Sequence, residues 1–522
     1  MSSPALLKRF LALPPSLRRS FWSSSARASP AGKPEIYDVV CVGGGPAGLS
    51  FVSALKSHSA TQGFKVALID SQDLTTSRTV NDADSYSNRC SSLTPSSLRF
   101  LKGIGAWERV NGDRTQAYHA MDVWDGVSGS KIHFDSVDKR STGLLGAIAE
   151  MVPGSRFRAS RRQYETSAEE AVVATMCENS SLASALLQRV KDFETEEQTA
   201  QVQMWDKTKV DSIDLGPEAE DEKSLDLSQW PIVSTQHGQI AARLLVGADG
   251  ANSPVRQFAG IPSHGWDYNQ HGVVATLHLD RTFSANELRT AYQRFLPTGP
   301  IALLPLPGNK ASLVWSTTPQ HAAKLKSLSP TDFTAAVNAA FRLMPVDINY
   351  MLATTTTTTD SQAEEFAWRE AATPPSSTGL PPNFPHITGV QLGTPASFPL
   401  KMRHADTYTG HRLALIGDAA HTIHPLAGQG LNLGLADAEA LAKQIVYGME
   451  HGMDIGSSWC LDGYNSERWA ANHAMIGVVD KLKKVYSAGS GPVVWGRSLG
   501  LGVVERLGPV KAAFMGAAAG VR

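Results

Sequence analysis

The apolar residues of the chain gather in short unbroken runs, several of which end at a glycine or an acidic residue. EIYDVVCV leads into Gly43, KVALID ends at Asp70, AARLLVGADG ends at Gly250 and LALIGD ends at Asp418. Unbroken apolar runs of this length are typical of strands that are buried on both faces, as in parallel sheets. The pattern therefore predicts an α/β protein built on a mostly parallel sheet.

A helical pattern follows the first run, because GGGPAGLSFVSALKSH reads as a glycine turn that feeds a helix. Gly43, Gly45 and Gly48 stand in GxGxxG spacing between this strand and this helix, and Asp70 closes the next strand. In dinucleotide-binding folds the first glycine makes the tight turn, the second admits the pyrophosphate and the third lets the helix pack. The helix amides hold the phosphates, and the acid binds the adenosine ribose. The stretch predicts a Rossmann-like site, with a purely structural glycine turn as the alternative.

Two later segments repeat this order of strand, glycine and acid. GADGANSPVR contains Asp249 and Gly250, with Ser253 and Arg256 just beyond them, and GDAAHTIHPLAGQG contains Asp418. Three widely separated segments that converge on one dinucleotide are a flavoprotein arrangement. The sequence therefore predicts FAD, rather than NAD, as the cofactor.

Composition and charge are those of an ordinary globular protein, and they argue against one class of partner. Of the 522 residues, 42% are hydrophobic and 19% charged, and a net charge of −1 argues against nucleic acid as a partner. The four cysteines are scattered, without CxxC or zinc-like spacing, which indicates reduced thiols. No segment after the N-terminal region is apolar over eighteen consecutive residues, so we expect no membrane-spanning helix.

The N-terminal residues 1–33 differ in composition from the rest of the chain. They contain Arg and Lys but no acid before Glu35, a serine cluster in FWSSSARAS, and apolar residues that would form one stripe of a basic helix. This composition is typical of a mitochondrial transit peptide. A disordered basic tail is the alternative.

GADGxxSxVR and GDAAHxxxPxxGQGxNxGxxDA resemble the segments that flank FAD in single-component flavin aromatic hydroxylases with the p-hydroxybenzoate hydroxylase fold. The likeness runs from about Ile36 to Met475. YSNRCSSLTPSSLRFLKGIGAWERV and YQRFLPTGPIALLPL narrow it to the ubiquinone-biosynthesis monooxygenases and, within them, to the mitochondrial members. The resemblance implies a substrate domain with an antiparallel sheet from about 263 to 400, and a C-terminal helical region. FAD is expected to be bound non-covalently, because no cysteine or histidine near the motifs is set up for a flavin linkage.

The resemblance also implies roles for single residues. Asp418 is expected at the ribityl hydroxyls of the flavin, Pro425 beside its ring, and Arg89 at the FAD phosphates, with a surface arginine as the alternative for Arg89. Gly428 and Gly430 are expected to leave helix amides bare near N1 and the C2 carbonyl, where the reduced ring carries negative charge.

The segment FLPTGP is a candidate wall of the ring pocket, because Gly299 and Pro300 can pass close to a flat ligand; an ordinary strand connection is the alternative. No catalytic side chain is named, since the flavin performs the chemistry. His421 and His424 lie three residues apart without a third metal ligand nearby. We therefore expect no metal and interpret both histidines as hydrogen-bonding residues that shape their loop.

The segments above predict a division of the chain into domains. The parts are a transit peptide at 1–33, a FAD-binding domain at 36–117, 164–262 and 403–447, a substrate domain at 118–163 and 263–402, and a C-terminal helical region at 448–522. The acidic insertion 206–230 and the Thr/Pro/Ser-rich insertion 353–386 are interpreted as surface loops or disordered segments. Basic residues from Lys481 onward alternate with apolar stretches, which suits contact with a membrane or a partner subunit, or packing on the FAD domain.

The expected activity is hydroxylation, at C5, of the aromatic ring of a polyprenylated 4-hydroxybenzoate-type intermediate of ubiquinone biosynthesis. The resemblance implies O2 as oxidant, a C4a-hydroperoxyflavin as oxygen donor, and electrons from ferredoxin and ferredoxin reductase, with NADPH as the alternative. It places the protein at the matrix side of the mitochondrial inner membrane, in peripheral contact with it and beside other ubiquinone-biosynthesis proteins. Two alternatives stay open: a flavin-dependent isoprenoid reductase of the same fold, and a catalytically idle FAD-binding subunit.

Overall fold

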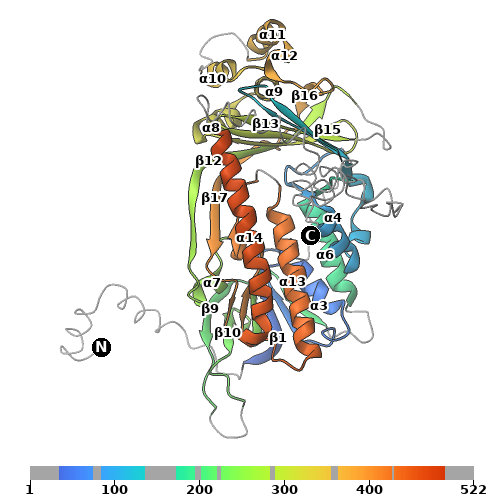
Figure 1. The fold of residues 1–522 in the computed structure, drawn as a ribbon. Helices are drawn as coiled ribbons and strands as arrows, with labels where there is room; N and C mark the ends of the chain where they lie inside the picture. The colour runs from blue at the N-terminus through green and yellow to red at the C-terminus, as the bar shows by residue number, and fades with distance from the viewer. Residues whose placement is uncertain are drawn as a thin grey trace, which may run out of the picture.

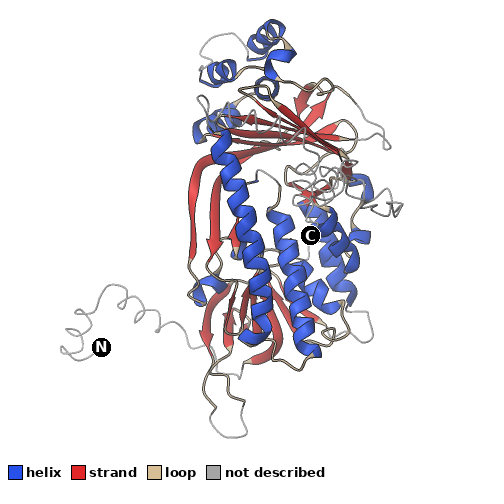
Figure 2. Ribbon diagram, viewed as in Figure 1, coloured by secondary structure: helices blue, strands red, loops and turns tan. Residues whose placement is uncertain are grey.

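The computed structural model contains two sheets, one mostly parallel and one mostly antiparallel, with helices against both (Figures 1 and 2). The described residues are 34–74, 84–135, 172–193, 201–219, 225–281, 289–353, 362–425 and 428–487. The predicted transit peptide at 1–33 and the apolar and basic tail beyond residue 487 lie outside them. The two sheets and the helical C-terminal region confirm the fold class predicted from the sequence.

The first sheet has eight strands. They are β1 (Glu35–Val42), β2 (Val66–Ile69), β8 (Val202–Trp205), β9 (Val210–Leu215), β10 (Pro231–Thr235), β11 (Gly238–Gly247), β18 (Thr409–Gly410) and β19 (Leu413–Leu415). Its centre is parallel, since β1 pairs with β2 and β11, and β11 pairs with β19. The four central strands are those that the unbroken apolar runs predicted.

Four helices pack together on one face of this sheet. They are α3 (Pro46–Lys56), α4 (Pro95–Gly103), α6 (Asn179–Asp192) and α13 (Gly430–Glu450). Helix α3 packs against α13 and α6, and α4 packs against α13 (Figure 1). Val40, Phe51 and Leu441 are fully buried in the core between strands and helices. Because parallel strands carry their loops at one end, this packing brings the glycine turns after β1, β11 and β19 together.

The second sheet has nine strands. They are β5 (Ala120–Asp125), β6 (Lys131–Asp135), β12 (Ser263–Leu279), β13 (Thr290–Leu296), β14 (Gly299–Pro305), β15 (Lys310–Thr317), β16 (Ile387–Val390), β17 (Ala396–Ala405) and β20 (His421–Thr422). All neighbouring strands are antiparallel except β5 and β13, which are parallel. Helices α8 (Pro319–Ser327), α9 (Pro330–Arg342) and α10 (Pro345–Ala353) lie beyond it at the top of Figure 1.

The two faces of the second sheet differ in chemistry. Alternate residues of its central strands, such as Val273, Leu313 and Trp315, form one apolar core with α9. The residues between them point to the opposite face, because successive side chains of a strand alternate. Beside the apolar Val274 and Val314 they include the small or polar residues Gln270, Gly272, Thr276, Ser312 and Ser316. The second face is thus more polar than the face that packs on α9.

Two long strands and one long helix join the two sheets. β12 runs into the second sheet from the end of α7 (Pro254–Phe258), and β17 pairs with it at both ends. Helix α14 (Ser458–Tyr486) runs beside both sheets in Figure 1. Near its start, Tyr464 donates to the carbonyl of Leu415 at 2.6 Å, and at its end Tyr486 stacks on Phe295 with ring centroids 3.9 Å apart. The elements therefore hold the sheets in one fixed arrangement.

A third sheet of three short strands lies between the two larger units: β3 (Cys90–Leu93), β4 (Gln116–Tyr118) and β7 (Ala174–Glu178). The predicted acidic loop at 206–230 is partly wrong, because β9 occupies 210–215 and pairs with β10 in an antiparallel ladder. Its acids Asp211 and Asp214 are exposed, so acidic composition marks the solvent side of an edge hairpin rather than an unstructured loop.

The reading of 353–386 as a structureless insertion is also wrong for the described part of that segment. It contains α11 (Gln362–Ala372) and the short α12 (Pro375–Thr378). Phe366 and Phe384 are buried in the core of the second sheet, and Arg369 pairs with Glu365 one turn away. The composition of the segment, rich in Thr and Pro, did not indicate that Phe366 of α11 is buried in the core.

Over the described ranges, no helix combines the length and the hydropathy that crossing a membrane requires. The four cysteines are all free thiols, and Cys41, Cys177 and Cys460 are buried.

Candidate active site

The turn after β1 uses its three glycines in three different ways. Gly43 has φ +111°, and a Cβ on it would lie 2.2 Å from the carbonyl oxygen of Ala248. A Cβ on Gly48 would lie 2.0 Å from the carbonyl oxygen of Gly43, so both residues are required by packing. A Cβ on Gly45 would meet nothing within 4 Å. The second glycine alone leaves open space beside the backbone, as a pyrophosphate would need.

Helix α3 begins at this turn without a side-chain cap. Gly45 is its N-cap residue and Pro46 its first residue, and no side chain accepts a hydrogen bond from the first turn. The amides at such a helix end attract anions, because they lack partners and lie at the positive end of the helix dipole. The geometry therefore suits a phosphate at the start of α3.

Asp70 lies directly after β2, beside the same turn. Its Oδ2 accepts a hydrogen bond of 2.6 Å from the amide of Gly44, and its Oδ1 accepts one of 2.6 Å from Gln72. The carboxylate thus holds the glycine turn in place. Each oxygen keeps a further lone pair, so the predicted contact with a ribose stays a prediction.

The turns after β11 and β19 are tied to each other by Arg256. Its guanidinium donates to the carbonyl of Ala419 at 2.6 Å and to that of Ala251 at 2.7 Å. Burial lowers the pKa of Arg256, although the nearby Asp249 carboxylate opposes this. Sequence reasoning singled out Arg256 within its motif, and the structure shows it as a brace between two turns.

The two acids of these turns differ in surroundings. Oδ2 of Asp249 accepts from the amide of Val255 at 3.3 Å, while Oδ1 is buried without a hydrogen-bond partner in the described structure. Burial raises the pKa of the Asp249 carboxyl. The Asp418 side chain is reached by solvent, yet protein atoms surround it closely enough for desolvation to raise its pKa. Both acids are suited to accept hydrogen bonds from a polar ligand.

Helix α13 also begins without a side-chain cap, at the second predicted glycine pair. A Cβ on Gly430 would meet nothing within 4 Å, and Gly428 has φ +59°. Asn432 fixes this end, because its amide donates to the carbonyls of Ser92 and Gly428, and its oxygen accepts from Thr94. Asn432 was not predicted as a site residue, although it lies inside the quoted GQGxN motif.

Arg89 lies one residue before β3, which passes beside this helix end. A Cβ on Gly428 would be 3.6 Å from the Cβ of Ser92 in β3. The Arg89 side chain is exposed and makes no hydrogen bond or ion pair with any residue that the structure describes. The structure places Arg89 near the predicted site, and its contact with a phosphate stays a prediction.

His421 belongs to a buried polar network around Asp437 of α13. Asp437 accepts from His421 at 2.5 Å, from the amide of Gly417 at 3.1 Å, and from Arg468 at 2.8 Å. Burial raises the pKa of Asp437, but the charges and hydrogen bonds of His421 and Arg468 outweigh it and leave the pKa at about 2. The prediction that His421 shapes the loop by hydrogen bonding is confirmed.

The same prediction for His424 is wrong. His424 is fully buried, and neither ring nitrogen has a hydrogen-bond partner among the described residues. Its ring packs edge-on against Tyr268, with centroids 5.0 Å apart and an interplanar angle of 81°. Burial, and next the charge of Lys483, lower the pKa of His424 to about 4, so the ring is neutral at physiological pH. The next residue, Pro425, lies at the last described position before Gly428.

Gly299 and Pro300 begin β14, an inner strand of the second sheet that pairs with β13 and β15. Gly299 has φ +139°, and a Cβ on it would lie 2.3 Å from the carbonyl oxygen of Ser316. The preceding residue, Thr298, accepts a hydrogen bond of 2.6 Å at its carbonyl from the side chain of Gln270. This turn is therefore fixed by β15 and by β12, and the predicted wall role of Gly299 and Pro300 remains to be tested.

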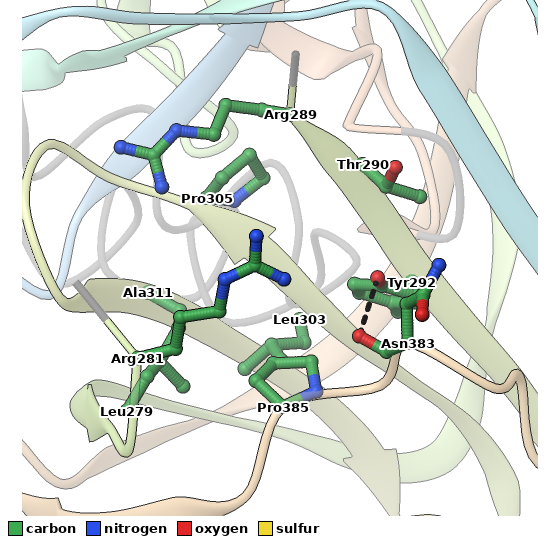
Figure 3. Close-up of a pocket in the computed structure, with 10 residues that line it drawn as sticks. All are labelled: Leu279, Arg281, Arg289, Thr290, Tyr292, Leu303, Pro305, Ala311, Asn383 and Pro385. Carbon is green, nitrogen blue, oxygen red and sulfur yellow. Dashed lines mark hydrogen bonds between the residues drawn. The ribbon is translucent and has the colours of Figure 1, made fainter. Parts of the chain in front are cut away.

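A separate pocket of about 170 Å³ lies near the other end of β13 and β14 (Figure 3). In Figure 3 the guanidinium groups of Arg281 and Arg289 converge on it, and Tyr292 donates to the carbonyl of Asn383 at 3.2 Å. Several lining residues, including Leu279 and Leu303, belong to the core covered by α9. None of the residues predicted from the sequence lines this pocket.

Taken together, the residues present fit FAD. Two uncapped helices, α3 and α13, pack together near Gly417, where an added Cβ would lie 3.3 Å from the Cβ of Ala47 and 3.9 Å from the Cα of Gly434. Open space at Gly45 and Gly430, and the unpartnered buried oxygen of Asp249, supply the amides and the acceptor that a dinucleotide needs. No group of three potential metal ligands occurs in the described ranges.

Comparison with known sequences agrees with this arrangement. A family model described as "FAD binding domain" matches residues 36–478. "Ubiquinone biosynthesis monooxygenase COQ6, mitochondrial" of Schizosaccharomyces pombe is 37% identical over 91% of this chain and 90% of its own length. The protein of the same name from Saccharomyces cerevisiae is 37% identical over 92% of each chain, and the human one 34% identical over 94% of each chain.

Solved structures support the fold. The p-nitrophenol 4-monooxygenase PnpA of Pseudomonas putida superposes with a TM-score of 0.58 at 17% identity, covering 92% of this chain and 97% of its own. PqsL of Pseudomonas aeruginosa in complex with 2-aminobenzoylacetate gives a TM-score of 0.56 at 20% identity, covering 90% of this chain and all of its own. The match over nearly the whole chain, together with the FAD-type geometry, shows that this chain is a FAD-dependent monooxygenase and belongs to the family of mitochondrial ubiquinone biosynthesis monooxygenases.

Proposed function

We propose that the protein hydroxylates C5 of the aromatic ring of a polyprenylated 4-hydroxybenzoate-type intermediate in ubiquinone biosynthesis. The observation that carries the proposal is the set of small and polar residues on the second face of the second sheet, among them Gln270, Thr276 and Ser316, away from the core that α9 covers. In Figure 1 this face lies toward α13, so a flat ring can be held between the sheet and the cofactor. The substrate class itself rests on membership of the family.

Bound FAD supplies the oxygen chemistry, because reduced flavins activate O2 without a metal. The proposed task of Gly43, Gly45 and Gly48 is to admit the pyrophosphate, with Asp70 on the adenosine ribose and Arg89 on the phosphates. The proposed task of Asp249, Gly250 and Asp418 is to bind the polar chain of the cofactor. These assignments are supported by the open space and the unsatisfied acceptors described above.

The proposed role of helix α13 is to stabilise the negative charge of the reduced flavin at its N-terminal end. Its N-terminus has no side-chain cap, and no atom lies within 4 Å of a Cβ added to Gly430. The proposed task of this end is to offer amides and the positive end of a helix dipole to the negative charge of a reduced ring. Such an interaction is worth about 0.3–1 kcal/mol when exposed and up to about 2 kcal/mol when partly buried. Pro425, Gly299 and Pro300 are proposed to wall the ring pocket and exclude water from it, which limits the loss of activated oxygen.

The electron source is proposed to be ferredoxin with its reductase. The chain has one GxGxxG between a strand and a helix, at Gly43, and we find no second such element for NADPH in the described part. NADPH bound transiently is the alternative. We propose the matrix side of the inner membrane as the location, beside other ubiquinone-biosynthesis proteins, because the substrate carries a polyprenyl chain.

The test is a single-turnover reaction with purified protein, reduced ferredoxin, a prenylated 4-hydroxybenzoate and labelled O2. One labelled oxygen atom in the ring of the product supports the proposal. Label found only in water or peroxide supports an idle subunit, and a product with a saturated prenyl chain supports an isoprenoid reductase. If NADPH alone reduces the flavin equally fast, the proposed hydroxylation stands, but NADPH rather than ferredoxin is the electron donor.

A further inference from the structure

Strand β12 has a bulge next to His271, the residue at which its pairing with β15 ends. Asp267 pairs with Lys401 and His271 with Pro399, so the three residues 268–270 lie opposite the single residue Leu400. Asn269 has φ +51° and is exposed, whereas Tyr268 and Gln270 are each 8% exposed. Bulges of this kind re-aim side chains and occur beside active sites. Here the bulge directs two buried side chains away from the α9 core.

The side chain of Gln270 is fixed with its acceptor unused. Its Nε2 donates to the carbonyl of Thr298 at 2.6 Å, and since that carbonyl only accepts, the contact settles which end of the amide is nitrogen. Oε1 is buried and has no hydrogen-bond partner in the described part of the chain. A buried acceptor without a partner is unfavourable, so native proteins retain one where it has a task.

Gln270 lies between the two segments that were predicted to wall the ring pocket. On one side it contacts Thr298 and Gly299, and a Cβ on Gly299 would be 3.0 Å from its Nε2. On the other side its neighbour Tyr268 packs on His424, which precedes Pro425. The bulge thus links the β13–β14 turn to the loop before α13.

We propose that Gln270 is a substrate-binding residue whose Oε1 accepts a hydrogen bond from the phenol hydroxyl of the ring. This deepens the proposed function and rests on it. A ring held by its hydroxyl at this point turns its free ortho carbon toward the α13 end in a fixed orientation. Gln270 therefore determines both the preference for a phenol over its ether and the position of the carbon that is oxidised.

The test measures binding, so that it does not depend on turnover. The probes are 4-hydroxy-3-(3-methylbut-2-enyl)benzoate and its 4-methoxy counterpart, which cannot donate a hydrogen bond. Calorimetric titration of FAD-loaded protein should show the phenol binding roughly 10-fold or more tightly than the ether. In the wild type, the ether leaves Oε1 of Gln270 without a hydrogen-bond donor. Leucine has no such oxygen, so in Gln270→Leu the ratio of the two affinities should fall to about 1.

Two controls separate a hydrogen bond from a steric effect. Gln270→Met keeps the length of the side chain without an amide acceptor and should lose the preference for the phenol as Gln270→Leu does. Asn338→Leu replaces a buried amide of α9, on the other side of the sheet, and should leave the ratio unchanged. FAD content and thermal unfolding confirm that each variant is folded. Equal affinities in the wild type, or an unchanged ratio in Gln270→Leu, would overturn the proposal. Failure of ring hydroxylation with the ratio intact would instead count against the proposed function alone.

Discussion

At the scale of single residues, the site divides into groups that the fold itself requires and groups that only a ligand explains. Gly43 and Gly48 belong to the first kind, since added Cβ atoms would collide with backbone. Gly45, Asp249 and Gln270 belong to the second, because the structure leaves open space or an unpaired atom beside each of them. The distinction can be tested, as it separates folding from cofactor binding.

Gly45→Val should leave the apoprotein as stable as the wild type, because its N-cap conformation (φ −75°, ψ 176°) suits valine and the space is open. FAD should bind at least roughly tenfold more weakly, which corresponds to about 1.4 kcal/mol. Gly48→Ala should instead lower the stability of the apoprotein by about 1–3 kcal/mol through overpacking. Flavin titration and thermal unfolding of both variants check this. Equal behaviour of the two would contradict the division of roles.

The buried ring of His424 gives a pH dependence with a defined sign. Its pKa in the folded protein is about 4, against about 6.5 in the unfolded chain, so the unfolded state binds more protons between these values. Its contribution to stability is complete above pH 6.5 and is lost as the pH falls toward 4. His424→Phe keeps a ring against Tyr268 but does not titrate.

Between pH 7 and pH 5, His424→Phe should lose about 2 kcal/mol less stability than the wild type. Denaturant unfolding at several pH values measures this difference. His411→Phe, at an exposed position, serves as the control and should follow the wild type. Parallel curves for wild type and His424→Phe would show that His424 does not titrate as described.

At the scale of elements, strands were easier to predict than their register. β1, β2, β11 and β19 were predicted because burial on both faces leaves an unbroken apolar run. The bulge in β12 was not, because SHGWDYNQHG has no alternation that shows which side chains turn inward. Gln270 was missed for this reason: a polar residue in a strand reads as exposed until the pairing is known.

The same limit explains why motif residues were placed better than their partners. Asp437 lies in the GxxDA part of a recognised motif, but nothing in the sequence indicated Arg468 as its partner. Arg468 comes from a different helix and completes the buried network. Composition predicted local structure least well. The Thr and Pro residues around α11 and the acids of β9 suggested loops, where the structure has a helix and a strand. Contacts between distant segments depend on packing that a single sequence does not display.

Arg256 offers a prediction at this scale, because it braces two turns of the cofactor site. Arg256→Lys removes the paired contacts to the carbonyls of Ala251 and Ala419, since lysine lacks the planar fork of arginine. Stability should fall by about 1–3 kcal/mol, and FAD should bind at least roughly tenfold more weakly.

A matched control exists on the far side of the second sheet, where Arg342 donates to the carbonyls of Phe384 and Pro385. Arg342→Lys should lower stability to a similar extent without changing the affinity for FAD. Flavin fluorescence titration with thermal unfolding distinguishes the two variants. If both weaken FAD binding equally, Arg256 acts through general stability and not through alignment of the turns.

At the scale of the whole molecule, the N-terminal segment is predicted to act apart from the fold. Residues 1–33 precede β1, so removing residues 1–30 should leave a folded, yellow protein that is no longer imported into mitochondria. Import assays with isolated mitochondria and a flavin spectrum of the purified truncated protein measure the two effects. Efficient import of the truncated protein would show that the targeting signal lies outside residues 1–30.

Helix α14 has a thermodynamic consequence for the two sheets that it runs beside. Because Tyr464 near its start is bound to Leu415 of the first sheet and Tyr486 at its end stacks on Phe295 of the second, melting of either sheet removes contacts that hold the helix against the other. Calorimetry should therefore record a single endotherm, with equal calorimetric and van't Hoff enthalpies. FAD binds at one end only, yet it should raise the melting temperature of the whole, and amide exchange in β14 and β15 should slow when the flavin is added.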